Sequence, residues 1–136
     1  DVGEKTIGLA VSDPGLAVAS PLVTLRRGKF TADAERLARL VAERRIGGLV
    51  VGLPVNMDGS EGPRCQSVRQ FAANLLTRLD LPLAFWDERL STAAVERFLV
   101  GVADMTRKRR GEVIDKMAAA YILQGALDAI ARQSRQ

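Results

Sequence analysis

Short apolar segments separated by turn residues open the chain. Residues 6–13 and 21–26 have the composition of β-strands, and Pro14 and Gly15 mark a turn between them. These two segments predict a hairpin. From residue 31 the hydrophobic positions recur instead at steps of three and four, which is typical of an amphipathic helix. The stripe consists of Ala34, Leu37, Ala38, Val41 and Ala42.

The middle of the chain predicts a strand, a helix and a second strand. The continuous apolar run at 46–54 ends in proline and is typical of a strand buried on both faces, so we expect it at the centre of the sheet. Residues 56–62 are rich in turn formers, and Pro63 suits the first position of a helix. Residues 81–86 then predict a further short strand.

Two more helices are expected towards the end of the chain. Ser91 or Thr92 can cap the first, Gly101 can end it, and residues 106–111 predict a basic loop before the second. Strands followed by alternating strands and helices predict an α/β or α+β fold with helices packed on a mixed sheet. Neither an internal repeat nor a linker divides the sequence, so residues 1–136 are expected to form a single domain.

The composition limits the catalytic and binding groups that the protein can use. Of the 136 residues 47% are apolar and 26% charged, as in ordinary globular domains, and only 4% are aromatic, which argues against base-stacking platforms. Cys65 is the single cysteine, which excludes a disulfide framework and indicates a reducing compartment such as the cytoplasm. Because histidine is absent, catalysis would have to use carboxylates, lysines, hydroxyls or bound metal ions.

The charge balance favours polyanionic partners. The chain contains twenty Lys and Arg residues and sixteen Asp and Glu residues, which gives a formal charge of +4 and a pI near 9.8. The sequence contains neither an apolar run of about 20 residues nor a signal-peptide pattern, so no membrane association is expected. Apolar stripes leave room for a homodimer interface, whose position the sequence does not indicate.

Acidic residues fall where ligand sites of such sheets gather. Asp1 precedes the first predicted strand, where an apolar strand is expected to lead into it, and Asp87 and Glu88 stand at the carboxyl end of another strand. Asp115 lies in the first turn of the last helix, beside alanines that allow close approach to the sheet. Because successive side chains of a strand point to opposite faces, only one of Asp87 and Glu88 is expected to face the site. Three converging carboxylates would suit two divalent cations such as Mg²⁺.

Each acid also has an ordinary structural explanation. Asp1 is equally explained as a terminal residue, Asp87 or Glu88 as a cap of the following helix, and Asp115 as a favourable charge at a helix N-terminus. The spacing alone leaves these alternatives open.

Several basic residues could contact a phosphate backbone. Arg89 could hold a phosphate or pair with its acidic neighbours, and Lys5 could touch substrate or remain a solvated turn residue. The loop that leads to Arg64 suits an anion at the following helix N-terminus, with a plain turn as the alternative. Four successive cations could guide a polyanion towards the site, or form a solvated loop. They are Arg107, Lys108, Arg109 and Arg110.

Read together, four segments resemble the YqgF family, also called RuvX, whose members are described as pre-16S rRNA nucleases and Holliday junction resolvases. The segments are residues 1–13, 51–64, 86–92 and 114–120, in family order. The most specific motifs are Gly52-Leu-Pro-Val-Asn-Met-Asp-Gly-Ser-Glu-Gly-Pro63 and Asp87-Glu-Arg-Leu-Ser-Thr92. One departure is Thr6, which stands where many members carry a basic residue.

This resemblance implies an RNase H-like fold with a central mixed sheet of about five strands and helices on both faces. It also implies a catalytic site of Asp1, Asp87, Glu88 and Asp115 that holds Mg²⁺ or Mn²⁺. Asp1, Glu88 and Asp115 are the expected metal ligands, with Asp87 as the alternative to Glu88.

The leading hypothesis is a cytoplasmic metal-dependent endonuclease that processes the 5′ end of precursor 16S rRNA, with branched DNA as the other family-level substrate. One alternative is an ATP-dependent phosphotransferase-like domain, because residues 1–8 also resemble the phosphate loop of the actin and sugar-kinase folds. The length argues against it, since those enzymes enclose the nucleotide between two such domains. Another alternative is a nucleic-acid-binding or transcription-associated module without hydrolysis.

Overall fold

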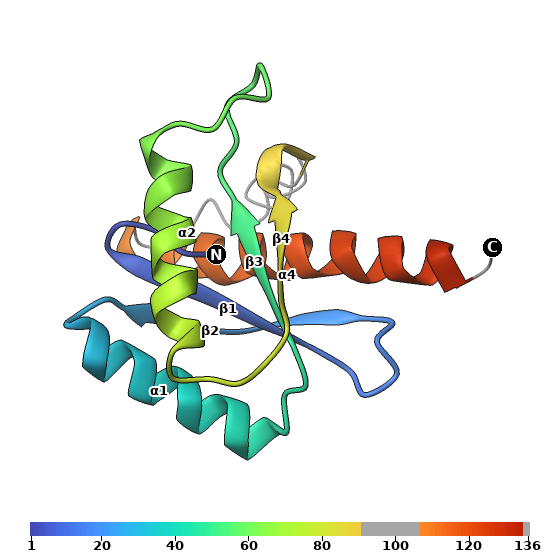
Figure 1. Ribbon diagram of the computed structural model, residues 1–136, viewed down its shortest axis with the longest axis horizontal. Coiled ribbons are helices and arrows are strands. Elements are labelled where there is room, and N and C mark those ends of the chain that lie inside the picture. The colour runs from blue at the N-terminus through green and yellow to red at the C-terminus, as the bar shows by residue number, and fades with distance from the viewer. Residues whose placement is uncertain (91–106, 135–136) are drawn as a thin grey trace.

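The computed structural model describes residues 1–90 and 107–134, which form four strands, three α-helices and one short 3₁₀ turn (Figure 1). In chain order they are β1 (Thr6–Ser12), β2 (Ala19–Arg26), α1 (Phe30–Arg44), β3 (Leu49–Leu53), α2 (Pro63–Leu76), β4 (Leu83–Asp87), η1 (Glu88–Leu90) and α4 (Arg107–Ser134). The helix expected from residue 91 to Gly101 lies outside the described residues.

Strands β1 and β2 form the predicted hairpin. They pair antiparallel from Thr6↔Arg26 to Ser12↔Ala19, and the register shifts between Leu9 and Ala10. The Asp13 carboxylate stabilises the turn because its Oδ1 accepts hydrogen bonds from the amides of Ala17 at 2.7 Å and Val18 at 2.9 Å. Asp13 has a lowered pKa, which these backbone hydrogen bonds cause.

Strands β3 and β4 pair parallel, from Leu49↔Leu83 to Leu53↔Asp87. In the part of the chain that the structure describes, the strands form two separate pairs, so the expected sheet of about five strands is too large. Residues 1–5 add no further strand to the β1–β2 pair. The amide of Gly3 donates to the carbonyl of Thr6 at 2.8 Å, and this turn leaves a single bridge, Val2↔Ile7, in place of another strand.

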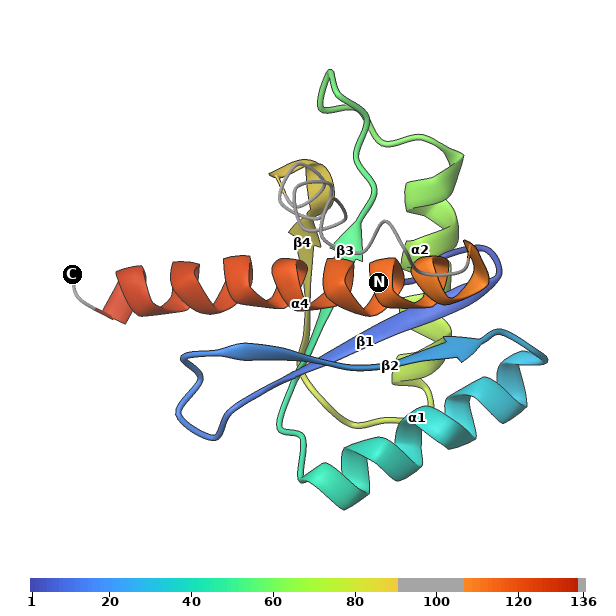
Figure 2. The ribbon, with the colours of Figure 1, turned by 180° about the vertical axis from the view of Figure 1, so that it is seen from behind.

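Helices cover both sides of the strands, as expected. Helices α1 and α2 pack together on one side, where the rings of Phe30 and Phe71 meet edge to face with centroids 5.7 Å apart. The long helix α4 crosses β1 and β2 on the other side (Figures 1 and 2). Its buried face is made mostly of small residues, which permits a close approach. The buried residues of α4 are Ala119, Ala120, Ile122, Ala126 and Leu127.

The basic loop expected at residues 106–111 is wrong for residues 107–111, because α4 already begins at Arg107. The cations belong to its first turn, where Gly111 does not interrupt the helix. A single glycine weakens a helix by about 1 kcal/mol, which packing along the rest of a 28-residue helix readily offsets. None of the described helices combines the length and apolarity needed to cross a membrane.

A buried carboxylate holds the turn between β2 and α1. Asp33 is 1% exposed, and its Oδ1 accepts hydrogen bonds from the amide of Gly28 at 3.1 Å and from Nη2 of Arg36 at 2.6 Å. The same Arg36 nitrogen also donates to the carbonyl of Arg26 at 2.8 Å. The N-cap residue Lys29 makes no side-chain capping bond, and Asp33 instead ties the residue before the cap to the first turns of the helix.

Replacing Asp33 by alanine should therefore destabilise the protein. We expect Asp33→Ala to lower the free energy of unfolding by about 3 kcal/mol, because a buried amide loses its acceptor and Arg36 loses its partner. Glu35→Ala, at an exposed position of the same helix, should change it by less than about 0.5 kcal/mol. Urea unfolding followed by circular dichroism measures both. Equal stability of the two variants would contradict this role of Asp33.

Candidate active site

Asp1 is held beside β1 by its backbone. Its carbonyl accepts a hydrogen bond from the amide of Gly8, and its amino group donates to the carbonyl of Gly8, both at 2.9 Å. The start of the chain therefore folds back along β1, and in both views it lies next to α4 (Figures 1 and 2). This position brings Asp1 towards the helix that carries Asp115.

Asp115 reaches the same place because α4 approaches β1 very closely. A Cβ built on Gly8 would lie 2.1 Å from the carbonyl oxygen of Asp115, so only glycine fits opposite this turn of the helix. The carboxylate of Asp115 then accepts a hydrogen bond from the hydroxyl of Thr6, with 2.7 Å between Oγ1 and Oδ2. The small residues expected to permit close approach do so, and Thr6 is an additional contact that the sequence did not indicate.

Glu88 completes the acidic group from the end of β4. It begins η1 and lies against Gly52 of β3, where a Cβ would come within 2.5 Å of Glu88 Oε1. Burial raises the pKa of Glu88, and the nearby charge of Asp87 adds to this effect, whereas the Asp1 amino group and Arg64 act in the opposite direction. Gly52 lies within a predicted strand, and a glycine at such a position often indicates that another group approaches the backbone closely.

The amino group of Asp1 lies within electrostatic range of two of these acids. Burial lowers its pKa to about 6, while the negative charges of Glu88 and Asp115 both raise it. Residues far apart in the sequence thus act on one point at the end of the sheet. Within residues 1–90 and 107–134, however, no three carboxylate or other metal-binding side chains are grouped tightly enough to hold a metal ion.

Asp87 and Glu88 belong to different elements, since Asp87 ends β4 and Glu88 begins η1. Asp87 pairs with Arg89, whose Nε and Nη2 lie 2.8 and 2.6 Å from its Oδ2. This pair lowers the pKa of Asp87, and the amide of Arg89 adds a second hydrogen bond to the carboxylate. Arg89 Nη1 also reaches the carbonyl of Met57 at 3.5 Å, which links β4 to the loop before α2. The salt-bridge alternative for Arg89 is the one present.

The remaining basic residues are distributed over two elements and a turn. Lys5 is exposed in the turn before β1, and Arg109 is exposed near the start of α4. Arg64, at the start of α2, lies closest to the acidic residues and acts electrostatically on Glu88. Arg107, Lys108 and Arg110 occupy the first turn of α4, and their side chains lie outside the described part of the structure.

The loop before α2 forms a self-contained turn. Asp58 Oδ1 accepts hydrogen bonds from the amide of Ser60 at 2.9 Å and from its hydroxyl at 2.6 Å. These bonds lower the pKa of Asp58 and place a negative charge where an anion was considered. The plain-turn alternative therefore describes this loop.

The fold and the acidic group define the class of protein. Strands covered by helices on both sides are consistent with the RNase H-like fold. A sequence model of the RuvX family, described as Holliday junction resolvase, matches residues 1–129. The chain belongs to this family.

Curated relatives agree with this assignment. A protein of Rhodospirillum centenum is 70% identical over 133 residues, which cover 94% of this chain and 70% of the relative. A protein of Rhodospirillum rubrum is 64% identical over 133 residues (98% and 83%), and one of Phenylobacterium zucineum is 67% identical over 129 residues (94% and 83%). Each of the three carries the name "Putative pre-16S rRNA nuclease". The chain is accordingly of nuclease type.

The contact between Gly8 and Asp115 provides a test of the geometry. Gly8→Ala should lower the free energy of unfolding by about 1–3 kcal/mol, because the added methyl group pushes α4 away from β1. Gly111→Ala makes the same change in α4 with nothing within 4 Å, and should raise stability by about 0.5–1 kcal/mol. Thermal unfolding compares the two. Similar effects of both substitutions would show that the close approach does not limit packing.

Proposed function

We propose that the protein is a metal-dependent endonuclease that hydrolyses phosphodiester bonds in precursor 16S rRNA. The observation that carries this proposal is the close approach of α4 to β1, which places Asp115, bonded to Thr6, opposite the Gly8 that holds Asp1. Carboxylates that share one partly buried place repel one another, and a divalent cation would offset that repulsion. The names of the relatives support precursor 16S rRNA as the substrate.

Asp1, Glu88 and Asp115 would hold Mg²⁺ or Mn²⁺. All three supply carboxylate oxygens, the ligands these hard cations prefer, and histidine and additional cysteines are absent from the chain. When bound, such ions supply activation of water and stabilisation of the leaving oxygen. Because no three described ligands are yet grouped, the side chains would have to rotate towards one another on binding. Asp87, engaged by Arg89, would remain outside the ligand set.

Thr6 would act as a positioning residue for Asp115. Its hydroxyl donates to Oδ2 and leaves Oδ1 for a cation, so the carboxylate is oriented before any metal binds. Lys5 and Arg109, both exposed, are further candidates for backbone contacts. The same holds for the positions of Arg107, Lys108 and Arg110 at the start of α4. We place this activity in the cytoplasm, where precursor rRNA is found.

A four-way DNA junction is the second candidate substrate, because the family model carries the description of a Holliday junction resolvase. The same carboxylates would serve either phosphodiester. Cleavage of one substrate in preference to the other decides between them.

Neutralising any proposed ligand should abolish cleavage without unfolding the protein. We expect Asp1→Asn, Glu88→Gln and Asp115→Asn each to reduce the rate at least about 100-fold, because each removes one anionic ligand of the metal. The measurement is gel-resolved cleavage of end-labelled precursor 16S rRNA and of a four-way junction with Mg²⁺, Mn²⁺ or a chelator.

Asp87→Asn is the matched control, since it neutralises the adjacent carboxylate that Arg89 already holds. It should cost much less than Glu88→Gln. Cleavage by Asp1→Asn at the wild-type rate, or cleavage that persists in the chelator, would refute the metal-dependent mechanism.

Thr6 should affect metal binding more than folding. Thr6→Val removes the hydroxyl at nearly constant shape, and we expect half-maximal cleavage to require about 10-fold more Mn²⁺. Thr6→Ser should retain most of the wild-type affinity for Mn²⁺. Titrating cleavage with Mn²⁺ separates half-saturation from the maximal rate. A Thr6→Ser variant as impaired as Thr6→Val would show that the methyl group matters instead of the hydrogen bond.

A further inference from the structure

A pocket with two arginines in its lining lies beside the first residues of the chain. It has a volume of about 410 Å³ and opens between α2, the end of β2 and the first residues of the chain. Its lining residues are Val2, Gly3, Glu4, Arg27, Gly28, Arg64, Ser67 and Val68. None of the proposed metal ligands is among them. The volume falls in the range of pockets that enclose small ligand groups.

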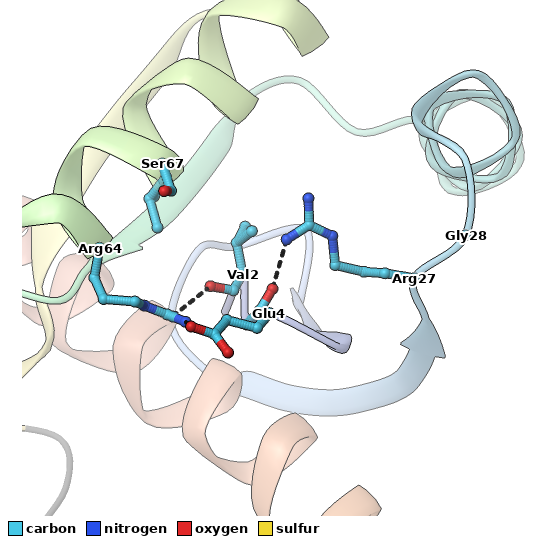
Figure 3. Close-up of a pocket in the computed structure, with 8 residues that line it drawn as sticks. Val2, Glu4, Arg27, Gly28, Arg64 and Ser67 are labelled. Atoms are coloured by element: carbon cyan, nitrogen blue, oxygen red, sulfur yellow. Dashed lines mark hydrogen bonds and ion pairs between the residues drawn. The ribbon is translucent and has the colours of Figure 1, made fainter.

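Two arginines reach this pocket from opposite sides (Figure 3). Arg64 comes from α2 and donates from Nη2 to the carbonyl of Val2 at 3.3 Å, and Arg27 donates from Nη1 to the carbonyl of Gly3 at 2.6 Å. The guanidinium of Arg27 also lies 5.1 Å from the centre of the Phe71 ring. These contacts hold each side chain in place. Each guanidinium makes only one hydrogen bond to the backbone.

Glu4 is the single acidic residue that lines the pocket, and it does not neutralise the two arginines. Glu4 lies 3.5 Å from Arg64 Nη1, but its side chain is 77% exposed, so this ion pair is weak and easily exchanged for another anion. Without that contact two guanidinium groups face one cavity. A guanidinium is suited to the oxygens of a phosphate because its donors form a planar fork.

The position of the pocket relates it to the reaction. Val2 and Gly3 directly follow Asp1, whose carbonyl is bonded to Gly8 opposite Asp115. A nucleic-acid strand that crosses the acidic residues would therefore pass the pocket with a neighbouring part of its backbone.

We propose that this pocket binds one backbone phosphate of the nucleic-acid substrate, next to but distinct from the phosphate that is cleaved, with Arg27 and Arg64 as its charged contacts. The proposal rests on the proposed function. It assigns the substrate a fixed register relative to the carboxylates, since a phosphate held here limits which bond reaches them.

The sharpest test adds a negative charge to the pocket without touching either arginine. Ser67 lines the pocket and is exposed, so Ser67→Glu should weaken nucleic-acid binding at least about 10-fold through repulsion of the phosphate. Gln66→Glu makes the same change of charge at the adjacent exposed position of α2, which does not line the pocket, and should weaken binding less than about 2-fold.

Binding is measured by fluorescence anisotropy of a labelled RNA that spans the 5′ end of precursor 16S rRNA, with a chelator present so that cleavage does not contribute. Equal affinities of the two variants would overturn the pocket proposal. Failure of the wild-type protein to bind this RNA or a labelled four-way junction would instead refute the proposed function, and the pocket proposal with it. Cleavage-deficient but normally binding protein would leave the pocket proposal standing.

The dependence of binding on salt tests whether the two arginines share one phosphate. Arg27→Gln alone should change the slope of log Kd against log salt concentration little, because Arg64 still neutralises the shared phosphate, and the double variant with Arg64→Gln should lower it by about 0.9. Arg44→Gln removes an equal charge at the far end of α1 and serves as the control. A double variant that loses about twice that slope would show two separate contacts, and an unchanged slope in the double variant would show that both arginines only support the backbone of Val2 and Gly3.

Discussion

The contact between Gly8 and Asp115 is the constraint on which the candidate site depends. Gly8 exchanges two backbone hydrogen bonds with Asp1 and at the same time faces the carbonyl of Asp115, where a Cβ would lie 2.1 Å away. One residue without a side chain thus brings two distant acidic segments together. Any larger residue would separate the helix from the strand, and the hydrogen bond from Thr6 to Asp115 would be lost with it.

Bringing these acids together works against folding. Burial raises the pKa of Glu88, which means that its charged form is disfavoured where it stands, and the charge of Asp87 adds to the cost. The fold reduces this cost by pairing Asp87 with Arg89 and by placing Arg64 near Glu88. A bound cation would also offset the cost of burying the Glu88 charge, so the charge that lowers stability would contribute to affinity for metal.

Each of the two arginines that line the pocket also supports the backbone next to Asp1. Arg27 and Arg64 hold the carbonyls of Gly3 and Val2, and these residues follow Asp1 directly. Side chains that fix the position of a proposed metal ligand therefore also present positive charge beside it.

Local patterns in the sequence determined much of the fold: the β1–β2 hairpin, the stripe of α1, Pro63 at the start of α2, and acids at the end of a strand. Each depends on neighbours within a few residues, so periodicity and turn chemistry suffice. Tertiary structure alone decided that Asp87 pairs with Arg89 while Glu88 lies against Gly52, because alternation along a strand does not say which of two neighbours makes which contact. It also decided the start of α4, the division of the strands into two pairs, and the roles of Thr6 and Arg27. Those depend on contacts between segments up to 109 residues apart, which no local pattern records.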